Sequence, residues 1–149
     1  MKCIVLGMGS FGASLAIKLT EQGNEVIGID NSMDRVEMFK EHVSHIICLD
    51  ATDQDAVSNL PIEDTDVIIV AIGENQGANL MATAAVKNLN AKRVISRSVN
   101  PLQENVLLAM GIEEIINPEV ESAERLAKKL CLTGLIDSFE IDGKYSIVE

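Results

Sequence analysis

Three glycines near the start of the chain have the spacing of a phosphate-binding turn. Gly7, Gly9 and Gly12 follow the apolar residues 3–6 and precede apolar residues at helical spacing. In such a strand–turn–helix context, the first glycine allows a tight turn, the second lets a pyrophosphate approach the backbone, and the third lets the helix pack close to the strand. The amides of the first helical turn and the helix dipole then attract phosphate charge. The candidate binding turn also contains Met8, Ser10 and Phe11. The alternative is a glycine-rich turn without a ligand.

Asp30 ends a second expected strand, residues 25–30. A carboxylate at this strand end can accept hydrogen bonds from an adenosine ribose. It also repels a 2′-phosphate, by roughly 3 kcal/mol for two unit charges ~5 Å apart at an effective dielectric of ~20. Arg35 is a further candidate binding residue, but it lies one turn into the following helix and cannot easily replace Asp30. The pattern favours NAD(H), ADP or ATP over NADP(H). The alternative role of Asp30 is to cap that helix.

Short apolar stretches alternate with amphipathic ones along the chain. Strands are expected at residues 3–6, 25–30, 45–50, 66–73, 93–97 and 113–117, each followed by a helix, the last at 118–130. The stretch 66–73 is the most hydrophobic, which is typical of a strand buried on both faces of a parallel sheet. This rhythm predicts the α/β class: a Rossmann-like, doubly wound, parallel six-stranded sheet of order 3-2-1-4-5-6.

Ligands of such sheets bind outside the carboxyl ends of the strands, at the switch between strands 1 and 4. Residues 50–52 would flank an adenine, residues 71–75 would lie near ribose and pyrophosphate, and Arg97 would reach a terminal phosphate or the second nucleoside. The alternatives are that residues 50–53 cap the third helix and that Arg97 pairs with a surface acid. The rule thus adds the candidate binding residues Asn31, Asp50, Ala51, Thr52, Ala71, Ile72, Gly73, Glu74, Asn75 and Arg97.

Composition restricts the class of protein. The 149 residues suit about one domain, and 47% of them are hydrophobic but only 3% aromatic, so the core is expected to consist of aliphatic side chains. The net charge of −11 argues against nucleic acid or an anionic membrane surface as the main partner. No apolar run reaches about 18 residues and no signal-peptide pattern opens the chain. The sequence therefore predicts a cytoplasmic protein without direct membrane insertion.

Motifs for catalysis or metal binding are missing from the sequence. Cys3, Cys48 and Cys131 lie far apart and are interpreted as free thiols. His42 and His45 lack further ligands nearby and are interpreted as surface histidines. No nucleophile elbow, zinc motif or P-loop occurs. We therefore predict no catalytic residue and no metal site.

The last residues break the alternating rhythm. Residues 138–149 contain two alternating stretches around Asp142 and Gly143, which indicates a hairpin. A lone hairpin is marginally stable, so it either joins another subunit or belongs to a longer protein, and the second is favoured. We expect a nucleotide-binding domain at 1–135, with 136–149 a linker and hairpin leading to a missing C-terminal domain.

A homodimer is expected from the apolar surface of the late elements. The helix expected at 101–111 presents Leu102, Val106, Leu107 and Met110, more apolar surface than a solvent-facing helix needs. Exposed patches of this kind usually mark an interface. The sequence therefore predicts a dimer joined through this fifth helix, the last helix and the tail.

Several stretches together resemble the KTN family, the RCK N-terminal domains. The specific parts are residues 50–53, residues 71–73 and the corner 117–119, and the resemblance covers about residues 1–135. Members of this family regulate Trk and Ktr potassium transporters and form the gating rings of some potassium channels. The resemblance implies binding of NAD(H), ATP, ADP or AMP without turnover. It also implies a homodimer or higher ring at the inner face of the membrane, a potassium-translocating membrane partner, and a following RCK C-terminal domain.

Three positions bear on how far the resemblance extends. Ser10 stands where ATP-favouring members often carry an arginine, and Leu49 stands where the family often has glycine. Glu119 matches a position near a divalent cation in some members, which makes it a weak metal candidate; its other interpretation is compensation of the helix dipole.

The alternative function is the N-terminal, NAD-binding part of a dehydrogenase. The expected sixth strand and last helix use residues up to about 132, which leaves no room for a catalytic domain within this sequence. No acid–base pair is placed near the second nucleoside. A nucleotide-sensing binding module, not an enzyme, therefore explains the sequence with fewer additions.

Overall fold

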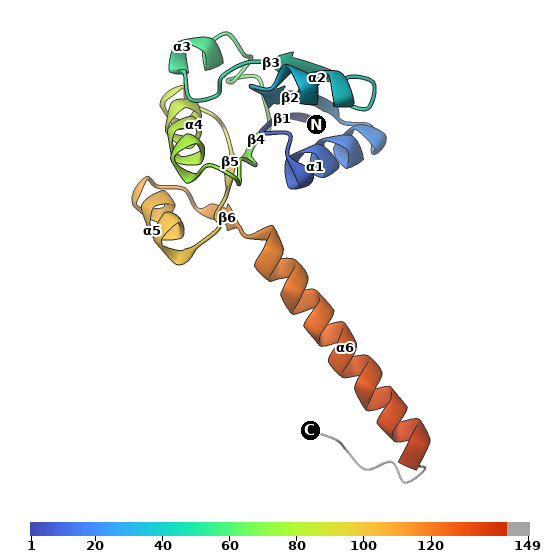
Figure 1. The fold of residues 1–149 in the computed structure, drawn as a ribbon. Coiled ribbons are helices and arrows are strands. Elements are labelled where there is room, and N and C mark those ends of the chain that lie inside the picture. The colour runs from blue at the N-terminus through green and yellow to red at the C-terminus, as the bar shows by residue number, and fades with distance from the viewer. Residues whose placement is uncertain (143–149) are drawn as a thin grey trace. The chain divides into compact units, whose positions relative to one another are not determined.

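The computed structural model describes the backbone of residues 1–142 and the side chains of residues 1–135. It divides into a first unit, Met1–Ile116, and a second unit that begins at Asn117. Strands and helices alternate through the first unit (Figure 1). The elements are β1 (Lys2–Leu6), α1 (Ser10–Glu21), β2 (Glu25–Asp30), α2 (Met33–Phe39), β3 (His45–Cys48), α3 (Gln54–Val57), β4 (Val67–Val70), α4 (Gln76–Asn88), β5 (Val94–Arg97), α5 (Pro101–Ala109), β6 (Glu114–Ile116) and, in the second unit, α6 (Pro118–Asp142).

The six strands form one sheet in the order β3-β2-β1-β4-β5-β6. Every neighbouring pair is parallel, and the register sets Ile4 of β1 between Ile27 of β2 and Ile68 of β4. The predicted doubly wound α/β fold and its strand order are thus confirmed. From β1 the chain adds β2 and β3 toward one edge of the sheet, and it then returns to add β4, β5 and β6 on the other side of β1. The carboxyl ends of β1 and β4 therefore flank the point at which the strand order reverses.

Two apolar clusters fill the space between the sheet and its helices. Ile4 and Leu6 of β1 pack into the cluster that contains Val57 of α3 and Val86 of α4. Val5, which points to the other face, packs into the cluster that α1 and α2 cover (Figure 1). Because successive side chains of a strand alternate between the two faces, a continuous apolar β1 supplies both clusters. Its end is therefore fixed from both sides.

The helices of the first unit differ in how their N-termini are capped. Four of them begin with a side-chain cap: Ser32 at α2, Asp53 at α3, Asn75 at α4 and Asn100 at α5. Within residues 1–142, α1 starts at Gly9 without a side-chain cap and without an acidic residue in its first turn. The first amides of α1 are therefore left for water or for a bound anion.

The second unit corrects the prediction for the tail. The sequence pattern predicted a helix ending at residue 130 and a hairpin from 138, whereas α6 runs from Pro118 to Asp142. The alternation at 138–142 is therefore not a strand. The lone Gly134 costs a helix only about 1 kcal/mol, and a helix that has already formed is extended more easily than a new element is started, so the helix continues. The predicted second hairpin strand, 143–149, lies outside the described residues.

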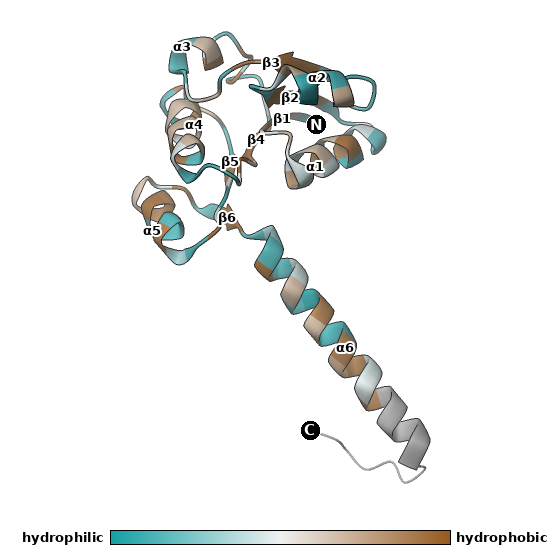
Figure 2. Ribbon diagram, in the orientation of Figure 1, coloured by the Kyte–Doolittle hydropathy of each residue, from teal (hydrophilic) through white to brown (hydrophobic). Residues whose placement is uncertain are grey.

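Among the described helices, none combines the length and the apolar character that crossing a bilayer would require. Figure 2 shows apolar and polar segments alternating along α6.

Candidate nucleotide-binding site

Two of the three glycines are required by the fold itself. Gly7 has φ +99°, a conformation that side-chain-bearing residues rarely adopt, and a Cβ there would lie 2.9 Å from Cγ1 of Ile72. A Cβ on Gly12 would overlap the carbonyl oxygen of Gly7. These glycines let β1, the turn and α1 pack tightly against one another. Their presence therefore says nothing by itself about a ligand.

Gly9 is different because the fold does not need it to be glycine. Its φ is −73°, and a Cβ there would meet, among the described residues, only Oε2 of Glu74 at 3.7 Å. This is an ordinary van der Waals distance. The free space beside Gly9 faces the uncapped start of α1, where amides and the helix dipole favour an anion. The absence of a side chain at this position is what close approach of a phosphate needs.

Asp30 is buried and firmly held, with 5% of its surface exposed. Its Oδ2 accepts a hydrogen bond from the amide of Met8 at 2.8 Å, and its Oδ1 accepts one from the amide of Ser32 at 2.9 Å. Asp30 thus ties the glycine turn to the end of β2. The alternative role as the cap of α2 is wrong, because the hydroxyl of Ser32 accepts from the amide of Arg35 and caps that helix.

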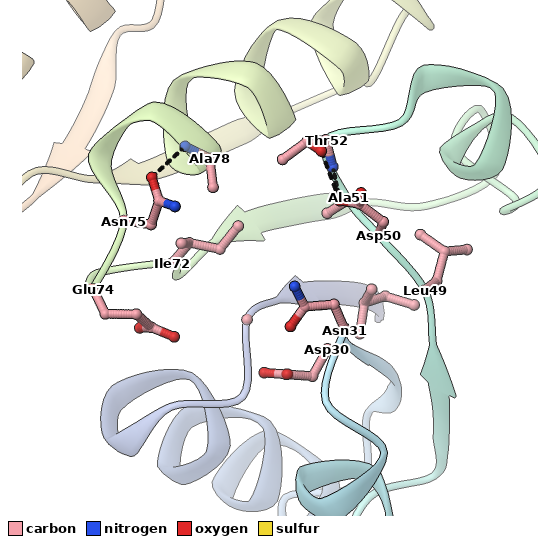
Figure 3. Close-up of a pocket in the computed structure, with 12 residues that line it drawn as sticks. Asp30, Asn31, Leu49, Asp50, Ala51, Thr52, Ile72, Glu74, Asn75 and Ala78 are labelled. Carbon is pink, nitrogen blue, oxygen red and sulfur yellow. Dashed lines mark hydrogen bonds between the residues drawn. The ribbon is translucent and has the colours of Figure 1, made fainter.

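A pocket of about 190 Å³ opens beside the ends of β1, β2 and β4 (Figure 3). Its walls are formed by Gly7, Ile29, Asp30, Asn31, Leu49, Asp50, Ala51, Thr52, Ile72, Glu74, Asn75 and Ala78. Most of these residues were predicted from the sequence, and they come from four different strand ends and the start of α4. The fold therefore brings the predicted clusters of strands 1 to 4 together. Apolar atoms and a few oxygens share the lining, which suits a planar base and its ribose.

The sequence prediction did not include three members of this lining. Ile29, Leu49 and Ala78 supply apolar surface to the pocket. Ile29 was assigned to the buried part of a strand, and Leu49 was noted only as a departure from the family pattern. Ala78 lies in the first turn of α4, and its position opposite residues 49–52 depends on how α3 and α4 pack on the sheet. No local sequence signal marks it.

Asp50 shapes the loop that forms one wall of the pocket. Its Oδ1 accepts hydrogen bonds from the amide of Thr52 at 2.9 Å and from the Thr52 hydroxyl at 2.7 Å. The hydroxyl bond is the main reason that the pKa of Asp50 lies below its ordinary value. Asp53, not Asp50, caps α3. The predicted capping role is therefore confirmed for Asp53 alone, and residues 50–52 form the wall itself.

Arg35 reaches across the site, which the sequence did not predict. Its Nη1 lies 3.3 Å from Oδ2 of Asp30 and 2.9 Å from Oε1 of Glu74. The hydrogen bond from Arg35 is the main cause of the lowered pKa of the Glu74 carboxyl. Arg35 also lines a second hollow, between α1 and α2, together with the predicted residues Met8, Gly9 and Ser10. The side chain of Met8 is buried in the core beneath.

The ends of β4 and β5 are held together by a buried asparagine that sequence analysis missed. Nδ2 of Asn79 donates to the carbonyl oxygens of Ile72 at 3.0 Å and Arg97 at 3.1 Å, and its Oδ1 accepts from the hydroxyl of Ser96. The side-chain amide of Gln103, through Nε2, also donates to the carbonyl oxygen of Arg97. A polar residue at a core-facing helical position is the sequence signal that points to such a bridge.

The remaining predicted residues lie around this bridge. Ala71 is buried in the apolar cluster that α1 and α2 cover. The guanidinium of Arg97 lies 5.7 Å from the ring centroid of Phe11. A Cβ on Gly73 would lie 2.5 Å from Nη1 of Arg97, so glycine is what allows this guanidinium to pack on the loop after β4. Arg97 therefore lies on the β4–β5 side of the glycine turn, as predicted from its strand end.

The metal prediction concerns a residue of the second unit. Glu119 lies in the first turn of α6, where a carboxylate is stabilised by the helix dipole. Within the described part of the chain, no group of three or more His, Cys, Asp or Glu side chains is placed to hold a metal ion.

Comparison with known proteins identifies relatives of the whole described fold. The TrkA-N domain profile matches residues 3–118. Ktr system potassium uptake protein C of Bacillus subtilis (strain 168) is 34% identical over 145 residues, which cover 97% of this chain and 66% of that protein. Ktr system potassium uptake protein A of the same organism is 29% identical over 145 residues, covering 97% of this chain and 65% of that protein. The chain thus spans just under two-thirds of the length of these relatives.

Solved structures with the same fold include proteins described as nucleotide-bound. The NAD(P)-binding domain of an exopolyphosphatase-related protein from Archaeoglobus fulgidus has a TM-score of 0.78 at 20% identity, covering 87% of this chain and 96% of that chain. The AMP-bound Kef CTD of Shewanella denitrificans has a TM-score of 0.72 at 22% identity, covering 89% and 81%. The GsuK channel bound to NAD has a TM-score of 0.69 at 16% identity, covering 77% and 21%.

These structural likenesses concern the fold alone, whereas the profile match covers the glycine turn, all six strands and the corner at Pro118. The chain belongs to the TrkA-N domain family.

Proposed function

We propose that this chain is the nucleotide-sensing part of a potassium-uptake system and that it binds NAD(H) or an adenine nucleotide without converting it. The observation that carries the proposal is the start of α1. Gly9 leaves open space there, the helix lacks a side-chain cap within the described structure, and the pocket of Figure 3 lies alongside. A phosphate beside Gly9 would accept hydrogen bonds from the free backbone amides of the first turn of α1.

The proposed positions of the ribose and the adenine follow from the position of the phosphate beside Gly9. The ribose would lie at the end of β2, where Asp30 is already oriented by two backbone amides. The adenine would enter the pocket between residues 49–52 and Ile72. The side chains of Leu49 and Ala78 offer apolar surface on which a base can pack. This placement uses the predicted residues of strands 1 to 4, and Arg97 remains a candidate for the second nucleoside.

Selectivity between NAD(H) and NADP(H) rests on Asp30 and Arg35 together. The buried carboxylate of Asp30 repels a 2′-phosphate, but Arg35 lies 3.3 Å from it and partly compensates that charge. Preference for NAD(H) is therefore expected to be smaller than Asp30 alone would produce. The ratio of the NAD⁺ and NADP⁺ dissociation constants measures it.

A binding role fits the chain better than a dehydrogenase role. The named relatives are potassium uptake proteins. If the chain only binds the cofactor, incubating it with NADH and a panel of carbonyl compounds leaves the NADH absorbance at the buffer rate. Steady oxidation above that rate would favour the dehydrogenase alternative.

The partner is proposed to be a potassium-translocating membrane protein, contacted from the cytoplasmic side. The relatives are longer than this chain, so the transport role of such a protein as a whole also depends on regions that this chain does not match. We propose that the nucleotide-binding domain comprises residues 1–135. Two nucleotides with different affinities for two states of the assembly would shift its equilibrium by that difference, typically ~1–3 kcal/mol.

A homodimer remains part of the proposal, with a corrected contact surface. Leu107 of α5 is fully buried in its own unit, so its predicted place at an interface is wrong. Leu102 is 74% exposed, and Leu108 of the same helix is exposed too. In α6, Leu126 and Leu130 lie four residues apart and are both exposed. These leucines supply the apolar surface that a dimer would bury.

Analytical ultracentrifugation at about 100 μM, where interfaces of micromolar affinity are populated, tests the dimer. Leu102→Glu with Leu126→Glu should yield a folded monomer, while Glu104→Gln on α5 should leave the dimer intact. A monomeric wild type at this concentration would refute the dimer.

Isothermal titration calorimetry with NAD⁺, NADH, AMP, ADP and ATP tests nucleotide binding. We expect at least one of these ligands to bind with micromolar or tighter affinity. If none of them binds to the folded protein, nucleotide sensing is refuted.

A further inference from the structure

The carboxylates of Glu74 and Asp30 point toward one another at the glycine turn (Figure 3). Arg35 connects them, with Nη1 2.9 Å from Oε1 of Glu74 and 3.3 Å from Oδ2 of Asp30. The two acidic residues come from different strand ends, β4 and β2, and Arg35 comes from α2. Together they form an acidic–basic–acidic row across the mouth of the turn.

Glu74 is the member of this row that lies beside the phosphate space. Its Oε2 is 3.7 Å from where a Cβ of Gly9 would be. The negative charge of Glu74 is therefore placed near the uncapped start of α1, which favours an anion. A phosphate that approaches Gly9 meets this carboxylate before it is fully bound.

The row is also able to open. The side chains of Arg35 and Glu74 are 38% and 61% exposed, whereas that of Asp30 is 4% exposed and anchored by backbone amides. Exposed ion pairs contribute little to stability. Glu74 and Arg35 can therefore separate without loss of the fold, while Asp30 stays in place.

We infer that Glu74 is a specificity-determining residue that disfavours nucleotides with a terminal phosphate, because its carboxylate competes for the same space beside Gly9. This inference rests on the proposed nucleotide binding. In a dinucleotide each phosphate forms an ester with a ribose and an anhydride with the other phosphate, and therefore carries a single negative charge. The terminal phosphate of ADP or ATP carries up to two. Each additional charge near Glu74 increases the repulsion, so Glu74 favours NAD(H) over ADP and ATP.

Arg35 sets the strength of this selection. While it pairs with Glu74, it lowers the effective negative charge at the turn, and when a phosphate binds it is placed to pair with that phosphate instead. Loss of Arg35 leaves Glu74 uncompensated. The selection against ATP should then become stronger.

The test compares the affinities of NAD⁺, ADP and ATP by calorimetry, with a chelator present so that no divalent cation masks phosphate charge. In Glu74→Gln, affinity for ATP should rise on the order of tenfold and affinity for NAD⁺ by less, about threefold or under. The matched control is Glu114→Gln in the edge strand β6, which removes the same charge from another exposed Glu–Arg pair, formed with Arg93. It should leave the ATP-to-NAD⁺ affinity ratio unchanged.

A second variant separates charge competition from direct binding. Arg35→Gln should weaken ATP more than NAD⁺, and adding Glu74→Gln should restore much of the loss. If Glu74→Gln weakens all three nucleotides, Glu74 binds the ligand directly and the inference is wrong. It is also wrong if the ATP-to-NAD⁺ ratio stays at the wild-type value while binding persists. If neither the wild type nor any variant binds a nucleotide, the proposed function fails together with it.

Discussion

Two groups of strand ends in the sheet use their polar groups in opposite ways. At the ends of β4 and β5, Asn79 and Gln103 satisfy backbone carbonyls within the protein, and the network is buried. After β1, the amides at the start of α1 have no side-chain cap, and after β3, the wall at Asp50 faces a pocket. The pocket wall thus offers polar groups to a ligand, whereas the network of Asn79 and Gln103 is a rigid support whose polar groups are already used.

This contrast would allow one fold to bind a ligand at the pocket while the buried network stays fixed. Asn79 joins the carbonyls of Ile72 and Arg97, so the loop that carries Glu74 is attached to β5. Changes in the buried network of Asn79 and Gln103 should therefore affect mainly stability. Changes at Gly9 and at the polar residues beside the pocket, Glu74 of the loop after β4 included, should affect mainly ligand affinity.

Asn79→Leu should produce the largest effect of these substitutions, and the effect should be a loss of stability. It removes three hydrogen bonds and leaves the Ile72 and Arg97 carbonyls buried with fewer partners, so we expect a loss of about 3 kcal/mol in the free energy of unfolding. Urea denaturation measures it. Asn88→Leu, an exposed position on the same helix, should cost less than about 0.5 kcal/mol. Equal effects of the two substitutions would break the comparison.

Gly12→Ala and Gly9→Ala form a matched pair within the glycine turn. The Gly12 variant should lose about 2 kcal/mol of stability or more, because its Cβ overlaps the carbonyl of Gly7. The Gly9 variant should be as stable as the wild type within about 0.5 kcal/mol but should bind nucleotide more weakly. Thermal unfolding combined with a ligand titration separates the two effects. A Gly9 variant that is as destabilised as the Gly12 variant would show that the fold, not a ligand, requires glycine there.

Asp30→Asn should act on affinity. Loss of the charge should weaken NAD⁺ binding by roughly 1–3 kcal/mol and narrow the difference between NAD⁺ and NADP⁺. The amide oxygen of asparagine can still accept from Met8, so the turn keeps its anchor. Calorimetric titration of both cofactors is the measurement. Tighter binding of NADP⁺ than NAD⁺ by the wild type would contradict the assignment of Asp30 to the ribose.

Thr52→Val should have the smallest effect, confined to the pocket wall. Without the hydroxyl bond, the pKa of Asp50 should rise toward its ordinary value, which NMR titration of the carboxyl measures. Because the pKa of Asp50 is lowered in the folded wild type, the stabilisation is present above the ordinary Asp pKa and is lost as pH falls through the lowered value. The variant should lack this acid-dependent component. An unchanged Asp50 pKa would show that the backbone bond suffices.

The features predicted best from the sequence are those that depend on residues close together along the chain. The glycine spacing, the apolar strands and the acid ending β2 each leave a local signal, and they predicted the strand order and most of the pocket lining. The pairing of Arg35 with Glu74 joins α2 to the loop after β4 and depends on tertiary distances that no local pattern contains. The role of Asn79 needs the positions of β4 and β5 on either side of it.

The errors have equally local causes. The alternation at 138–142 fits a strand by its period, but the preceding residues already form a helix, and extending a helix is easier than starting a hairpin. Leu107 was assigned to an interface because an apolar helix has more than one apolar face, and the structure shows which face is buried. In both cases the apolar pattern was present in the sequence, but the neighbouring structure decided whether it formed a strand or an exposed face.

Binding at Gly9 is the central claim, and calorimetric titration of Gly9→Asp with NAD⁺ and ADP tests it most directly. Gly134→Asp, the same substitution at an open helical glycine of the second unit, is the control. The account predicts that the wild type and Gly134→Asp bind, whereas Gly9→Asp keeps a wild-type circular dichroism spectrum but shows no binding, because its carboxylate occupies and repels the phosphate position. Unchanged affinity in the folded Gly9→Asp variant would contradict the account.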